Sequence, residues 1–199
     1  MEASDDQKDD IYSDFNICTT AAHLILFGTS AWALNQISIF QHPWAKISFS
    51  LTMGHGLLGV VLHVWSRQNL VAPPDIRFAK IYWRSSLMVK SIPLLCFNLE
   101  ILGIKMFNTL YTVLPILTQI RWKREEKHWN CFNVLNILVL LYLSAAKGDA
   151  WVSGSTAIGT MVHFISTRHF AFSNMKPDNV TAIGISILNL LGLQAILQS

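Results

Sequence analysis

Long apolar stretches alternate with short polar or charged breaks along most of this chain. Seven stretches can be distinguished, over residues 18–40, 47–65, 85–102, 107–120, 131–146, 151–166 and 180–197. A helix needs about 20 apolar residues to cross the bilayer core, with roughly 17–25 the usual range. The pattern therefore predicts an all-α integral membrane protein, a bundle of about seven transmembrane helices.

Residues 85–120 decide the number of helices, because they fit either one long kinked helix or two short helices joined near residues 105–108. Cytoplasmic loops carry an excess of Lys and Arg. With two helices, Lys46, Lys105 and Lys147 fall on one side of the membrane, and the other 12 of the 15 Lys and Arg residues fall on the opposite side. With one helix the split is seven against seven, and Lys105 lies inside the membrane. The charges thus favour seven helices over six, with a cytoplasmic N-terminus and a luminal or extracellular C-terminus.

Composition supports a membrane protein with one folded domain. Of the 199 residues 14% are charged, against about 25% in soluble domains. Residues 1–17 hold six acidic side chains and one lysine, so we expect a disordered cytoplasmic tail there and a single transmembrane helical domain over 18–199. The net charge of +3 is spread between apolar stretches. This spread predicts the lipid bilayer as partner and no nucleic acid. The three cysteines form no C-x-x-C pair, so neither a disulfide framework nor a zinc site is expected.

Two of the predicted helices, 47–65 and 151–166, share the pattern G-x-x-x-x-G-x-x-x-H. It is carried by Gly54, Gly59 and His63 and by Gly154, Gly159 and His163. In the seven-helix interpretation these are the second and sixth helices, and they run in the same direction. A parallel 3+1+3 repeat would place them so. Chance recurrence of small residues, which let membrane helices approach closely, is the simpler explanation.

Four short segments resemble the transmembrane protein 276 family of uncharacterised multi-pass membrane proteins. They are residues 22–26 (AHLIL), 92–98 (IPLLCFN), 151–159 and 177–180 (PDNV). The resemblance extends over most of the chain and implies a small multi-pass membrane protein. It implies no activity, catalytic residue or cofactor. Where the family pattern has a longer polar link after the third helix, this chain has almost none.

Ionisable side chains inside membrane helices are costly, so each is a functional candidate. Glu100 could bind a cation or relay a proton, or it could lie solvated near the luminal interface. His63 and His163 lie inside predicted helices, as do His23 and His55. A metal site is one interpretation of them, but no H-E-x-x-H or Cys/His ladder is present. Hydrogen bonding between helices is therefore the preferred reading of the histidines.

Asp149 follows Lys147 and Gly148 between two predicted helices. It could act as an acid or a ligand at a membrane mouth, although a tight turn explains it more simply, because Gly and Asp both favour turns. We find no pattern of a catalytic nucleophile, a phosphate loop or a dinucleotide fold. The sequence thus assigns no catalytic residue, cofactor or metal.

Three functions remain open. The first is a structural or accessory role through lateral helix contacts with partner proteins or a second copy, in the endoplasmic reticulum or another internal membrane rather than the plasma membrane. Small residues support it, namely Gly154, Ser155, Gly159, Gly184 and Gly192. The second is a small-solute transporter with a polar path near Glu100. The weakest is an intramembrane lipid-processing enzyme that uses Asp149 or a histidine.

Overall fold

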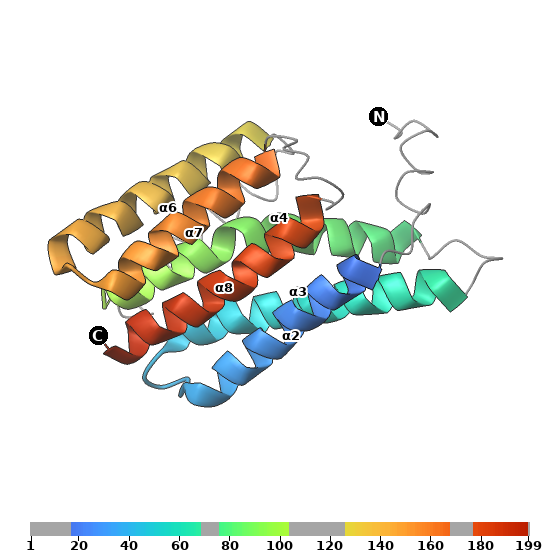
Figure 1. Cartoon of the computed structure of the whole chain (residues 1–199), viewed down its shortest axis with the longest axis horizontal. Helices are drawn as coiled ribbons and strands as arrows, with labels where there is room; N and C mark the ends of the chain where they lie inside the picture. The colour runs from blue at the N-terminus through green and yellow to red at the C-terminus, as the bar shows by residue number, and fades with distance from the viewer. Residues whose placement is uncertain (1–16, 69–75, 104–125, 168–176, 199) are drawn as a thin grey trace.

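The computed structural model describes residues 17–68, 76–103, 126–167 and 177–198, and every regular element in this part of the chain is an α-helix. The helices are α2 (Ile17–Gln36), α3 (Pro43–Gln68), α4 (Ile76–Ile101), α6 (Glu126–Lys147), α7 (Ala150–Thr167) and α8 (Pro177–Gln198) (Figure 1). The prediction of an all-α chain is confirmed. The predicted helix 107–120 lies outside the described residues, and so does the predicted tail 1–17 except for Ile17.

Three of the helices are long and apolar enough to cross a membrane, by length and composition. These spans are Ile17–Gln36, Pro43–Val64 and Asp178–Gln198, and Cys131–Lys147 is a shorter apolar helix. They are compatible with an integral membrane protein.

The ends of several helices differ from the sequence prediction, and two of them are informative. We expected the first helix to continue to residue 40, but α2 ends at Gln36 and a turn follows in which the Ser38 hydroxyl accepts a hydrogen bond from the Phe40 amide. We expected the third helix to begin at residue 85, but α4 begins at Ile76. Its first turns carry basic residues, including exposed Lys80. A helical end that faces water needs no apolar residues, so the apolar pattern could not mark this start.

Neighbouring helices run in two directions. Helices α2, α4, α6 and α8 point one way, and α3 and α7 point the other way (Figure 1). Glu100, near the end of α4, contacts the start of α3, and Lys147 at the end of α6 donates to the carbonyl oxygen of Ile101 at the end of α4 (3.1 Å). We call this end of the bundle the Glu100 end, and the opposite end, where α8 begins, the Asp178 end.

The directions of the helices determine at which end of the bundle each helix begins and finishes. Because α4 and α6 are parallel, α4 ends at the Glu100 end and α6 begins at the Asp178 end. The described chain also begins and finishes at opposite ends, since α2 starts at the Asp178 end and α8 finishes at the Glu100 end (Figure 1).

Glycines let α2 and α3 pack closely. A Cβ atom at Gly56 would lie 2.8 Å from the backbone nitrogen of Phe27, so the two backbones are nearly in contact there. One turn further along α3, a Cβ atom at Gly59 would lie 2.7 Å from Cδ2 of the His23 ring. The missing side chain at residue 59 therefore leaves the space that the imidazole occupies.

The interior is apolar and tightly filled, and the outer faces are apolar as well. Leu26, Phe49 and Phe97 are fully buried. On the outer face of α6, in contrast, Leu135 and Leu138 are more than half exposed. Soluble monomers rarely expose large contiguous apolar faces, whereas a face that contacts lipid is expected to be apolar.

Candidate functional site

The four polar residues singled out from the sequence do not meet at one site. Glu100 and Asp149 lie at the Glu100 end of the bundle, because one is near the end of α4 and the other precedes α7. His63 and His163 lie toward the Asp178 end, on α3 and α7. A single polar cavity shared by Glu100, His63 and His163 is therefore not formed.

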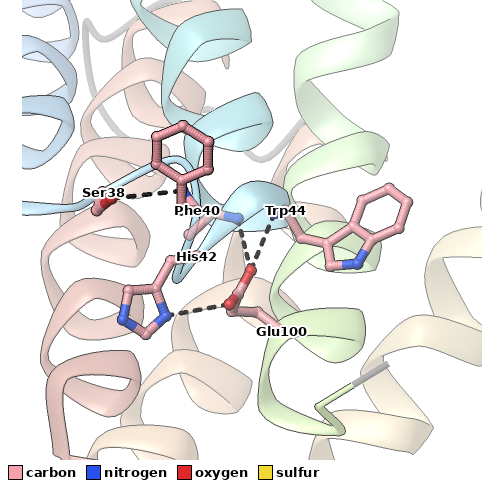
Figure 2. Close-up of polar contacts among 6 residues, drawn as sticks. Ser38, Phe40, His42, Trp44 and Glu100 are labelled. Carbon is pink, nitrogen blue, oxygen red and sulfur yellow. Dashed lines mark hydrogen bonds and ion pairs between the residues drawn. The ribbon is translucent and has the colours of Figure 1, made fainter. Parts of the chain in front are cut away.

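Glu100 caps the start of α3 from the neighbouring helix. Its Oε2 atom accepts hydrogen bonds from the backbone amides of Trp44 and Ala45, both at 3.0 Å, and its Oε1 atom is 3.1 Å from Nδ1 of His42 (Figure 2). The first amides of a helix have no partner within the helix, and the positive end of the helix dipole favours a carboxylate. Glu100 thus satisfies two of these amides and ties α4 to α3.

Asp149 caps the helix that follows it. Its Oδ1 atom accepts from the backbone amides of Trp151 (2.7 Å) and Val152 (3.4 Å), at the second and third positions of α7. Gly148 has a φ of 65°, the left-handed conformation that glycine adopts readily at the end of a helix. The segment is a tight turn between α6 and α7, and nothing in its geometry supports the interpretation of Asp149 as an acid or a ligand.

His163 lies between α6 and α7, away from the other histidines. Its Nδ1 atom is 3.4 Å from Nδ2 of Asn133 on α6, and its ring lies 5.4 Å from the ring of Phe164. The side chain is buried. His163 therefore takes part in a contact between α6 and α7, in line with the interpretation of the histidines as residues that bond helices together.

Three histidines and a tyrosine from three helices form a compact group, which we call the histidine cluster. The ring of His23 on α2 lies 5.4 Å from that of His55 and 5.7 Å from that of His63, both on α3, by ring centroids. Tyr82 on α4 lies 5.0 Å from His55 and 5.7 Å from His23. His55 and His63 are eight residues apart on one helix face, and His23 fills the gap between them that Gly59 leaves.

Hydrogen bonds fix the rings of the histidine cluster. Nε2 of His23 is 2.9 Å from the Tyr82 hydroxyl, and Nδ1 of His55 is 2.8 Å from the Ser85 hydroxyl. The other ring nitrogen of His23, Nδ1, is buried and has no hydrogen-bond partner. A buried polar atom without a partner is uncommon in folded proteins. This nitrogen lies against Gly59 of α3.

A cavity of about 10 Å³ lies beside the cluster, lined by His23, His55 and Tyr82 together with Asp178 and Thr181 of α8. This is about the volume that one water molecule needs. Asp178 is exposed in the first turn of α8 and lies close enough to interact electrostatically with His23 and Tyr82. Among the described residues, no group of three His, Cys, Asp or Glu side chains could hold a metal ion.

A second polar group lies deeper, where α2, α3 and α8 meet. Ser30 and Thr52 have their hydroxyl oxygens 2.9 Å apart, and Nδ2 of Asn189 donates to both at 3.0 Å. All three side chains are completely buried. Hydrogen bonds between side chains hold membrane helices together with about 0.6 kcal/mol each on average. We call this group the hydroxyl triad.

Sequence reasoning weighed a histidine metal site and preferred hydrogen bonding between helices, and it missed Tyr82 and the hydroxyl triad. One signal was present in the chain. Ser48, Thr52, His55, Gly59 and His63 recur every three or four residues along α3, which places them on one helix face. The partners on α2, α4 and α8 carry no such signal, because helix contacts between distant segments are not encoded locally.

No protein-family model, curated protein or solved structure matches this chain. The resemblance to the transmembrane protein 276 family therefore stays a prediction.

Proposed function

We propose that the chain is a multi-pass integral membrane protein that acts as a structural or accessory component through lateral contacts with other membrane proteins or with a second copy. The observation that carries this proposal is that the polar residues of the bundle cap helices or link one helix to another. Glu100 and Asp149 cap helices, and the hydroxyl triad and the pair Asn98–Asn136 tie helices together. These groups stabilise a bundle rather than line a reaction site.

The proposed arrangement has seven crossings, with the N-terminus in the cytoplasm and the C-terminus in the lumen or outside. The parallel directions of α4 and α6 support it, because α4 finishes at the Glu100 end and α6 begins at the Asp178 end. An odd number of crossings also agrees with the described chain beginning and finishing at opposite ends. The bias of Lys and Arg toward one side supports the orientation.

A parallel 3+1+3 repeat is compatible with this arrangement, since the helices of α2–α3–α4 and of α6–α7–α8 run in the same sequence of directions. The shared glycines have different neighbours, however. A Cβ atom at Gly59 would meet His23 of α2, whereas one at Gly159 would lie 2.9 Å from Leu94 of α4. The histidines agree better, because His63 contacts α2 and His163 contacts α6, the first helix of its own triplet.

The surface for lateral contacts differs from the one suggested by the small residues. Cβ atoms at Gly159, Gly184 and Gly192 would meet Leu94, Val162 and Phe97, so these glycines serve packing inside the bundle. The outer face of α6 is the better candidate. Its exposed side chains are apolar, and they include Leu135, Leu138, Leu141 and Tyr142.

Photo-crosslinking in membranes tests the proposal. A photoreactive amino acid at residue 138, which is 55% exposed, should crosslink to a partner or a second copy, and the same amino acid at residue 140, which is fully buried, should not. Products that contain only lipid at residue 138 would count against lateral protein contacts. Imaging of a fluorescently tagged chain tests the proposed location in the endoplasmic reticulum or another internal membrane.

Small-solute transport is the second candidate, and the histidine cluster favours it. Ionisable groups inside membrane proteins often mark ion pathways and proton relays. The cavity beside the cluster, with its volume of about 10 Å³, has room for about one water molecule and not for an organic solute.

A further inference from the structure

Buried and partly buried polar groups follow one face of α3 over most of its length. From the start of the helix they are the capped amide of Ala45, the buried hydroxyls of Ser48 and Thr52, the buried ring of His55 and the partly buried ring of His63. From residue 45 to residue 63 the helix rises about 27 Å at 1.5 Å per residue. This is close to the roughly 30 Å thickness of a bilayer core. The face thus has polar groups at successive depths across a membrane.

Side chains from other helices complete this line of polar groups, which we call the polar file. Where Gly59 leaves a gap on α3, the His23 ring fills it and reaches the Tyr82 hydroxyl. Two turns deeper, Ser30 and Asn189 join Thr52. Consecutive levels of the file are separated by about one helical turn, near 5 Å, and a cavity with about the volume of one water molecule lies at the level of the histidine cluster.

Each end of the polar file reaches a partly or fully exposed titratable group. At the Asp178 end, exposed Asp178 borders the cavity beside the histidine cluster. At the Glu100 end, the Glu100 carboxylate contacts His42, whose side chain is 25% exposed (Figure 2). Protons can therefore enter and leave from water on both sides.

We propose that the polar file conducts protons across the bilayer, so that the solute of the second candidate function is the proton. This proposal rests on that candidate and on the seven-crossing arrangement. Its middle levels contain imidazoles and hydroxyls, which both donate and accept hydrogen bonds. Three buried atoms along the file lack a partner and can accept a water or a proton: Nδ1 of His23, Oγ of Ser48 and Oδ1 of Asn189.

The transfer at His23 shows how protons balance. With the ring neutral and its proton on Nε2, an arriving proton binds Nδ1 and makes the ring cationic. The Nε2 proton then passes to the oxygen of Tyr82, 2.9 Å away, while the Tyr82 hydroxyl proton passes to a water in the cavity that Asp178 also borders. One proton enters and one leaves, and the neutral ring must return its proton from Nδ1 to Nε2 before the next transfer.

The histidine cluster is bordered by four helices. Asp178 and Thr181 of α8 line the cavity beside His23 of α2, His55 of α3 and Tyr82 of α4. The cluster therefore has a carboxylate beside its cavity, at the Asp178 end of the bundle.

Proton flux into liposomes tests the proposal. The purified full chain is reconstituted into vesicles that contain a pH-sensitive dye, and a potassium gradient with valinomycin drives protons inward. We expect acidification faster than in empty vesicles. Thr52→Val keeps the side-chain shape and removes the hydroxyl in the middle of the file. It should slow the flux by about tenfold, which corresponds to about 1.4 kcal/mol in the barrier.

A matched control and a second variant separate conduction from folding. Thr156→Val removes a buried hydroxyl that, like that of Thr52, bonds to a carbonyl within its own helix, but it lies on α7 away from the file. This control should conduct like the unmodified chain. Ser48→Ala removes a hydroxyl without a partner, so it breaks no hydrogen bond, and it should slow the flux as Thr52→Val does.

Protease protection of tags at both chain ends on the same vesicles reports insertion. If the tags lie on opposite faces and the flux equals that of empty vesicles, proton conduction is overturned while the seven-crossing arrangement stands. If both tags lie on the same face, the arrangement fails and the polar file fails with it. Full flux in both Thr52→Val and Ser48→Ala, or an equal loss in Thr156→Val, would also overturn the proposal.

Discussion

The contact between His23 and Gly59 can be tested with a single added methyl group. In Gly59→Ala the new Cβ atom would meet Cγ and Nδ1 of the His23 ring and lie 2.7 Å from Cδ2. The ring cannot move aside easily, because it is 1% exposed and its Nε2 atom is bonded to Tyr82. Overfilling a packed interior costs about 1–3 kcal/mol. We therefore expect Gly59→Ala to destabilise the bundle by this amount.

Gly54→Ala on the same helix is the matched control, because a Cβ atom there would have nothing within 4 Å. Alanine is a better helix former than glycine by up to about 1 kcal/mol, so this variant should be slightly stabilised. The two variants should differ by about 2–4 kcal/mol, or about 5–15 °C in melting temperature for a chain of this size. Thermal unfolding in mild detergent, followed by intrinsic fluorescence, measures the difference. Equal melting temperatures would refute the close packing of His23 on Gly59.

Substitutions at three further positions test individual polar contacts in the same unfolding assay. Glu100→Gln removes the charge that caps α3 and should lower stability by about 1–2 kcal/mol; an unchanged melting temperature would mean that the cap of Figure 2 contributes nothing. Asp149→Ala removes the cap of α7 and should cost about 1 kcal/mol, whereas Asp149→Asn, which keeps an oxygen acceptor, should cost less. Asn179→Leu should raise stability by about 1 kcal/mol, because both amide atoms of Asn179 are buried without partners; a loss of stability would show that the amide has a partner after all.

The helices could be predicted from this sequence because apolar stretches of membrane length are best explained as helices that cross a membrane. Six of the predicted stretches coincide with α2, α3, α4, α6, α7 and α8. The ends were less predictable. The start of α4 at Ile76 extends the helix through a basic segment, where hydropathy carries no signal. The turn at Gly148 was predictable, because Gly and Asp together favour a turn.

The polar contacts were harder to predict, because they depend on which helices are neighbours. From the sequence, Glu100 could be a cation or proton site or a carboxylate solvated near the luminal interface, but its partners are amides 55 and 56 residues earlier in the chain. The cluster needs His23 and Tyr82, which are 59 residues apart. Only His55 and His63 could be grouped from the sequence, because their spacing places them on one face of α3. Tertiary packing, rather than local pattern, decides which polar residues meet.

The number and direction of crossings is the claim on which the rest depends, and tags at the two chain ends measure it most directly. In sealed microsomes with the cytoplasmic face outward, we expect a protease to remove the N-terminal tag and to leave the C-terminal tag protected until detergent is added. Removal of both tags from intact microsomes, or protection of both, would mean an even number of crossings and would contradict the account.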